Sequence, residues 1–374
     1  MAAGLLRARG IAATRIEEGR ERSRLWRARP RVTDRDLALY TRQLSTMINA
    51  GLPIAHCLGI LAEQGDCVSL RRVTMRVAAD VARGLTLADA FGQHPRVFGD
   101  LFTNMVNVGE AAGALETALA RLSTYLEKSA LLGRKVKAAM IYPLTIVGVA
   151  ALVVMFMMTF VIPTFAQMFT HFGADLPRPT RVVIALSEFA RAQGVWLMAI
   201  ALGATATARR LARTDPGRLL LDRLALKIPG VAPLIRKVAI ARVTRTLGTL
   251  IACGVPILEG LRITARTAGN RIIENTVMQT RSALVAGRTL TEPLRGRVGL
   301  PAMVVQMVNV GEQTGSMEEM LTKIADFYDD EVDTAVASLT TLLEPVIIVV
   351  LGIVIGGLVV AMYLPIFRLV TVIR

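Results

Sequence analysis

The sequence predicts an all-α integral membrane protein that contains two copies of one helical domain. The first observation is an internal repeat, in which residues 106–110 recur unchanged 202 residues later as residues 308–312. The second is a long uncharged apolar segment near the end of each copy. The third is the helical spacing of apolar residues elsewhere, with no alternating pattern typical of strands.

Composition points to the lipid bilayer. Hydrophobic residues make up 53% of the chain and the mean hydropathy is +0.49, which is more apolar than an ordinary soluble protein. The net charge of +15 fits the cytoplasmic flanks of membrane spans and attraction to anionic lipid headgroups. Nucleic acid is disfavoured as a partner, because the basic residues adjoin apolar runs and only 5% of the chain is aromatic.

The first helical domain is expected at residues 34–137, after a basic and mobile tail at residues 1–33. Thr33 and Asp36 have the spacing of a capping box, which predicts a helix start. A last long helix that runs toward the membrane is predicted by an apolar stripe at residues 115, 119, 122 and 126.

Matched breakpoints predict the same helices in both copies. Gly51 is expected to end one helix and Pro53 to help begin the next, and their counterparts are Gly254 and Pro256. Capping-box spacings also recur at matched places, Thr86 with Asp89 and Thr289 with Glu292.

Three membrane-spanning helices are expected. Residues 138–166 and 342–367 contain uncharged runs long enough to cross a hydrocarbon core of about 30 Å. Residues 192–208 are a shorter run, where a returning helix would bring both copies to the same side. The remaining segments are a short periplasmic connector at 167–191, a basic cytoplasmic linker at 209–238, the second helical domain at 239–341 and a tail at 368–374.

The distribution of lysine and arginine sets the direction of the spans. Arg134, Lys135 and Lys137 precede the first span, whereas the connector carries only three arginines. The linker after the second span begins with a dense group of arginines, at residues 209, 210, 213, 218 and 223. Positive charge therefore predicts that both large domains and the N-terminus lie in the cytoplasm.

Two glycine-glutamate motifs are the sharpest local features. Glu110 and Glu312 are candidate acidic contacts for a basic partner surface. The structural alternative is that the glycines lie where helices meet closely and that each carboxylate lies near a helix start. The residues of the two motifs are Gly109, Glu110 and Gly113 in the first copy and Gly311, Glu312 and Gly315 in the second.

Further candidates lie at the third span. Glu344 precedes Pro345, and an ionisable group at membrane depth is a functional candidate. The alternative is a hydrated position at the headgroup boundary, with the proline marking a kink or a restart of the helix. Gly352 and Gly356 would let another helix approach closely, unless they reflect ordinary loose packing.

No catalytic constellation is visible. The chain lacks a phosphate-binding loop, a zinc-protease motif and a nucleophile elbow. His56, His94 and His171 are scattered, and the three cysteines are expected to be small buried thiols. Neither a cofactor, a metal nor an enzymatic activity is expected. A transporter and a membrane protease are the alternatives, although most of the repeat lies outside the spans and no nucleophile or paired aspartates are apparent.

The order of these motifs, from about residue 34 to the C-terminus, resembles the type II secretion system F protein family, which includes the PilC-like proteins of type IV pili. The resemblance also rests on Leu176-Pro177 and on the segment from Leu364 to Phe367. Carried over by residue, the family's Gly-Glu motif falls on residues 109–110 and 311–312, and its Glu-Pro motif on Glu344 and Pro345. Family members often begin with a longer segment of short strands, so this chain is expected to start partway through it.

The resemblance implies an inner-membrane platform protein with two cytoplasmic six-helix domains, three spans and no enzymatic activity. It implies a cytoplasmic assembly ATPase, other inner-membrane assembly proteins, pilin-like or pseudopilin subunits and further copies of the chain as partners. Membrane lipid is expected as surroundings and nucleic acid is not expected as a partner. Protein secretion by a type II system is the first functional expectation, and assembly of a type IV pilus is the alternative.

Overall fold

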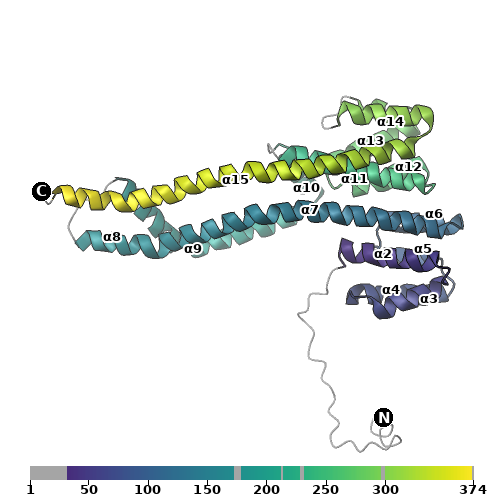
Figure 1. Cartoon of the computed structure of the whole chain (residues 1–374), viewed down its shortest axis with the longest axis horizontal. Helices are drawn as coiled ribbons and strands as arrows, with labels where there is room; N and C mark the ends of the chain where they lie inside the picture. Colours follow the sequence, from purple (N-terminus) through teal and green to yellow (C-terminus); the bar gives the residue numbers. More distant parts are fainter. Residues whose placement is uncertain (1–31, 172–177, 212–213, 228–230, 296–299, 373–374) are drawn as a thin grey trace, which may run out of the picture.

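The computed structural model describes residues 32–171, 178–211, 214–227, 231–295 and 300–372. Every regular element in these ranges is helical, which confirms the all-α prediction for them. Figure 1 shows two clusters of helices at one end, continued by long helical rods that run side by side to the other end. Nearly all of the predicted N-terminal tail and the Leu176-Pro177 turn lie outside the described residues.

The first helical unit runs from α2 to the start of α7. Its elements are α2 (Asp34–Asn49), α3 (Ile54–Gln64), α4 (Val68–Ala82), α5 (Leu87–Gly92), α6 (Asp100–Ala111) and α7 (Leu115–Phe156). The predicted capping box at Thr33 is confirmed, because its hydroxyl accepts from the Asp36 amide and the Asp36 carboxylate accepts from the Thr33 amide. The core includes Phe91, Phe98 and Phe102, all nearly fully buried.

The second helical unit repeats this order from α11 to the start of α15. Its elements are α11 (Val231–Ala252), α12 (Ile257–Thr267), α13 (Arg271–Val285), η2 (Glu292–Leu294), α14 (Ala302–Thr314) and α15 (Met317–Val372). The short 3-10 turn η2 stands where the first unit has the helix α5. Pro293 replaces Ala90, whose N–H donates to the Thr86 carbonyl, and a proline has no N–H for that bond. The six-helix count implied by the resemblance therefore differs between the two units.

Two rods leave the helical units without a break. One is α7 followed by the π-helical turn η1 (Met157–Val161) and α8 (Ile162–His171), and the other is α15. The helices covering 115–165 and 317–364 are long and apolar enough to cross a membrane, and their most apolar windows are only 6% and 11% buried within the chain. Pro143 and Pro345 lie inside these helices, so the helix does not restart at either proline.

The segment between the rods is also largely helical. Helix α9 (Arg178–Leu211) contains the predicted second span and much of the expected connector, and α10 (Asp215–Ala225) lies within the expected basic linker. Two helices in the described part of the chain meet the length and apolarity test for a membrane span, and α9 is not among them. Helix α9 contacts η1, α8 and α15, which places it against both rods.

The two helical units share part of one core. Leu250, Val255 and Ile263 of the second unit belong to the same cluster of buried side chains as the core of the first unit. Burial of these apolar side chains across the boundary favours a fixed arrangement of the two units. The duplicated units are therefore packed against each other as well as connected in sequence.

Candidate functional site

Glu110 and Glu312 each bind the start of a neighbouring segment of their own unit. The Glu110 carboxylate accepts from the backbone N–H groups of Leu87 at 2.9 Å and of Ala88 at 3.1 Å, at the N-terminus of α5. Glu312 accepts from the Leu290 N–H at 2.8 Å. A carboxylate at a helix N-terminus satisfies free N–H groups and is favoured by the helix dipole. The predicted carboxylate at a helix start is therefore found, but the helix that Glu110 caps is α5 and not its own helix, α6.

The glycines of the same motifs let helices approach closely. A Cβ atom on Gly109 would lie 2.6 Å from the Ala118 Cβ on α7, and one on Gly311 would lie 3.1 Å from the Met317 Cα on α15. Gly113 and Gly315 have φ angles of +66° and +73°, which favour glycine over other residues. The motif thus builds the turn into α7 and α15.

The paired breakpoints also adopt one geometry in both copies. Gly51 and Gly254 both have φ of +82°, and each ends its helix with the two backbone bonds of a Schellman motif. Pro53 and Pro256 stand directly before α3 and α12. The second breakpoint lies at the boundary between units, because Val255 belongs to the core that both units share.

A series of ion pairs joins the first stretches of α7 and α15. Arg121 pairs with Glu318 at 3.0 Å and Lys128 pairs with Asp326 at 2.9 Å. Lys135 pairs with Asp333 farther along the two rods. The basic partners are spaced by two helical turns, and their exposure limits each pair to about 0.2–1 kcal/mol. The series sets the register of the two rods more than it stabilises them.

Helix α11 adds buried contacts to both α7 and α15. The Arg245 side chain is only 10% exposed and bonds to both Asp326 and Asp329 on α15. Beside it, the Tyr125 hydroxyl on α7 lies 3.0 Å from the Thr246 hydroxyl on α11, in a buried position. These contacts connect α7, α11 and α15 where the two units meet.

Hydroxyl groups of α9 bond to backbone carbonyls in both rods. Thr180 donates to the carbonyl of Ala361 at 2.6 Å. In an α-helix that carbonyl would accept from residue 365, which is a proline without an N–H. The hydroxyl therefore satisfies an acceptor that the proline leaves free.

The other rod has the same arrangement at the matched proline. Ser187 donates to the carbonyl of Met158 in the π-helical turn. The Ile162 N–H donates to the Met157 carbonyl, as in a π-helix. The Met158 carbonyl would accept from the next residue, Pro163, which has no N–H. Pro163 and Pro365 are counterparts in the repeat, so the unduplicated helix α9 binds each copy close to the matched proline, five residues before Pro163 and four residues before Pro365.

Replacing Thr180 with valine is expected to weaken the packing of α9 against α15 by about 1 kcal/mol, because the Ala361 carbonyl loses its donor. Thr180→Ser keeps a hydroxyl and is the matched control. The melting temperature of the whole protein in detergent, followed by circular dichroism, measures the effect. Equal losses in the valine and serine variants would show that packing and not the hydrogen bond matters at this position.

The remaining predicted residues are not brought together with these sites. Glu344 and Pro345 are exposed on α15, and a Cβ added to Gly352 or Gly356 would meet no atom of the described chain within 4 Å. His56 and His94 lie in the first unit, and the described residues contain no group of three side chains suited to a metal ion.

The cysteines are free thiols in the described structure. Cys57 is fully buried, and Cys67 and Cys253 are partly buried. Burial raises the pKa of the Cys57 and Cys253 thiols, which lowers the fraction of reactive thiolate at neutral pH. The expectation of small packed thiols is confirmed for Cys57 and holds in part for the other two.

Sequence reasoning missed the ion-pair series and the α9 hydroxyls. Basic residues at 121, 128 and 135, two helical turns apart, were a signal for a charged seam on one face of α7. The matched prolines at 163 and 365 were a signal for free carbonyls that need a donor inside an apolar segment.

Comparison with known proteins agrees with this architecture. Residues 40–163 and 243–365 match the family described as type II secretion system (T2SS), protein F. The type IV pilus assembly protein PilC of Myxococcus xanthus is 44% identical over 338 residues, which cover 90% of this chain and 81% of the relative.

Other relatives cover both kinds of machinery. PilC of Pseudomonas aeruginosa is 40% identical over 343 residues, 91% of each chain. The type II secretion system protein F of Vibrio cholerae is 31% identical over 359 residues, 96% of this chain and 88% of the relative. The family match spans more than half of the sequence and falls once on each copy of the repeat. This chain therefore belongs to the type II secretion system protein F family.

Proposed function

We propose that this chain is an inner-membrane platform protein of a type IV pilus assembly system. It receives motion from a cytoplasmic assembly ATPase and passes it to pilin-like subunits in the membrane. Identity supports pilus assembly over secretion, because the PilC relatives share 37–44% of residues with the chain and the secretion relatives share 31–32%. The sequence alone favoured secretion, which stays the second candidate.

The observation that carries the proposal is the continuity of the two rods. Helices α7 and α15 begin inside the helical units and continue into the apolar windows. A displacement of either unit reaches the membrane through unbroken helix, without a flexible joint. The ion pairs between the rods and the bonds from α9 would keep the two movements together.

Deletion and complementation test this function. Loss of the gene is expected to abolish surface pili, and the full chain is expected to co-purify from membranes with the assembly ATPase. Loss of secreted exoproteins with normal pili would favour the second candidate. Uptake of a solute by vesicles that contain only this protein would favour a transporter and contradict both.

The platform role requires both helical units in the cytoplasm, with α9 as the returning span. Reporter fusions near residues 60 and 270 are expected to show the same side of the membrane. If the two reporters were found on opposite sides of the membrane, α9 could not be a span and the proposed coupling role would be wrong.

Weakening the helix of the first rod is expected to stop movement of the first helical unit from reaching the membrane. Changing residues 137–139 of α7 to glycine places three poor helix formers between the last ion pair and the apolar window, at about 1 kcal/mol each relative to alanine. The variant is expected to reach the membrane at normal levels and to assemble far fewer pili. Lys137→Ala is the control, since it removes the charge and keeps the helix. Normal piliation in the glycine variant would contradict transmission through the rod.

A further inference from the structure

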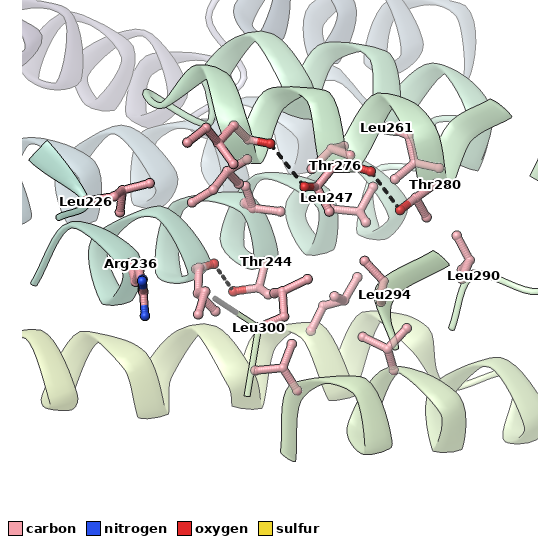
Figure 2. A pocket seen from close by; sticks show the side chains of 18 of the residues that line it. Leu226, Arg236, Thr244, Leu247, Leu261, Thr276, Thr280, Leu290, Leu294 and Leu300 are labelled. Atoms are coloured by element: carbon pink, nitrogen blue, oxygen red, sulfur yellow. Dashed lines mark hydrogen bonds between the residues drawn. The ribbon is translucent and has the colours of Figure 1, made fainter. Parts of the chain in front are cut away.

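The second helical unit contains a large apolar cavity. Its volume is about 590 Å³, and α10, α11, α13, α14 and α15 form its walls. Figure 2 shows aliphatic side chains from several helices around it. The hydroxyls of Thr244 and Thr280 already donate to carbonyls of their own helices, at 2.8 Å and 3.0 Å. The walls therefore offer an apolar ligand a nearly complete hydrocarbon surface.

The first helical unit is filled at the matched place. Phe91, Phe98 and Phe102 pack together there, with ring centroids 4.4–5.0 Å apart. Their counterparts in the repeat are the smaller residues Leu294, Leu300 and Val304, and all three line the cavity. The duplication has thus left a solid core in one unit and a cavity in the other.

A cavity of this size and lining is not suited to stay empty or to hold water. The cavity is partly open, so its apolar lining stays exposed to solvent unless a ligand covers it, and such exposure is unfavourable. Water needs polar partners, which these walls provide sparsely. The volume falls in the range of about 300–1,000 Å³ that is typical of ligand pockets in proteins.

One end of the cavity is positively charged. Arg223, Lys227 and Arg236 line it, and Figure 2 shows Arg236 beside Leu226 at the end opposite Leu290. None of the ion pairs found within the described part of the chain involves these three basic residues. An apolar chamber with a cationic end fits a hydrocarbon chain that carries an anionic head.

The charged end adjoins the membrane part of the molecule. Helix α10 follows α9, which packs against the apolar rods, and Figure 1 places α10 at the end of the second unit toward which the rods extend. Leu220 and Leu224 of α10 line the cavity and are also 53% and 51% exposed. An apolar group can therefore pass from the bilayer surface over these leucines into the cavity.

We propose that the second helical unit binds an acidic phospholipid of the surrounding bilayer. One acyl chain fills the cavity, and Arg223, Lys227 and Arg236 hold the headgroup phosphate. Bound lipid then supplies the packing that three phenylalanines supply in the first unit, and it ties this unit to the membrane surface. The proposal does not depend on which filament the platform assembles.

Photolabelling of the reconstituted full chain tests the cavity. The probe is phosphatidylglycerol with a photoreactive group near the end of one acyl chain, in vesicles of phosphatidylcholine. Labelled peptides are expected from α13 and α14. The double variant Leu300→Phe with Val304→Phe copies the filling of the first unit and is expected to lower the labelling by about tenfold. Met303→Phe on α14 is the matched control, because Met303 is 43% exposed and does not line the cavity.

A second pair of variants tests the charged end without changing the core. Lys227→Gln with Arg236→Gln is expected to remove the preference for labelled phosphatidylglycerol over labelled phosphatidylcholine. Melting curves confirm folding, and the filled variant is expected to melt no lower than the parent protein. Equal labelling of the filled variant and the Met303→Phe control would overturn the proposal. Equal labelling of the parent by both lipids, or labelling by a photoreactive free fatty acid alone, would overturn it as well.

Discussion

Replacing Gly109 with alanine is expected to destabilise the first helical unit by about 1–3 kcal/mol. The added methyl group would lie 2.6 Å from the Ala118 Cβ and 3.1 Å from the Leu115 Cα. Neither neighbour can rotate away, since one is a short side chain on a helix and the other is backbone. Helices α6 and α7 must move apart, which loosens the packing around Met105 and Leu119. Hydrogen exchange of the α6 and α7 amides in the full chain measures the loss.

The same substitution at two other glycines provides the controls. A Cβ on Gly311 meets Met317 and Met320 at 3.1–3.2 Å, so Gly311→Ala is expected to cost less. A Cβ on Gly59 in α3 meets no atom within 4 Å, and Gly59→Ala is expected to stabilise by up to about 1 kcal/mol through helix propensity. If Gly109→Ala matched Gly59→Ala, close approach would not be the reason for glycine at position 109.

Replacing Glu110 with glutamine is expected to cost about 1.5–3 kcal/mol. Both carboxylate oxygens accept backbone N–H groups at the start of α5, and the amide of glutamine would turn a donor toward one of them. The loss of charge also removes the favourable interaction with the helix dipole. Thermal unfolding of the full chain and hydrogen exchange across residues 86–92 measure the effect.

Glu312→Gln in the second unit is the matched control. It separates the loss of the helix cap from any other effect of changing the glutamate of the motif. Only one oxygen of Glu312 accepts a bond, and its Oε2 atom is buried without a partner among the described residues. Glutamine can keep the bond to Leu290, so Glu312→Gln is expected to cost less than about 1 kcal/mol. A larger loss at Glu312 than at Glu110 would contradict the capping role.

Local features of the fold were predictable from the sequence. The repeat is visible as recurring sequence, and the capping box at Thr33 and the helix ends at Gly51 and Gly254 depend on contacts between residues a few positions apart. The apolar runs in α7 and α15 were predictable for the same reason. The exception is Thr289, where the capping spacing recurs but Pro293 prevents the helix that α5 forms in the first unit.

The candidate site was less predictable because its contacts join distant segments. Glu110 was recognised as a motif residue, yet its partners Leu87 and Ala88 lie 22–23 residues upstream. The ion pairs between the rods join residues 197–198 positions apart, and neither partner reveals the other in a single sequence. The cavity depends on three modest size differences between the copies, which matter only when their side chains meet in space.

The bonds from α9 also bear on how the protein is made. Thr180 and its acceptor Ala361 are separated by 181 residues, so the hydroxyl is synthesised long before the carbonyl that it serves. Ser187, by contrast, bonds to a carbonyl that is synthesised only 29 residues before it. The first rod and α9 can therefore pack together early, whereas α15 must pack beside them later, and a chain truncated before residue 361 would leave the Thr180 hydroxyl without this acceptor.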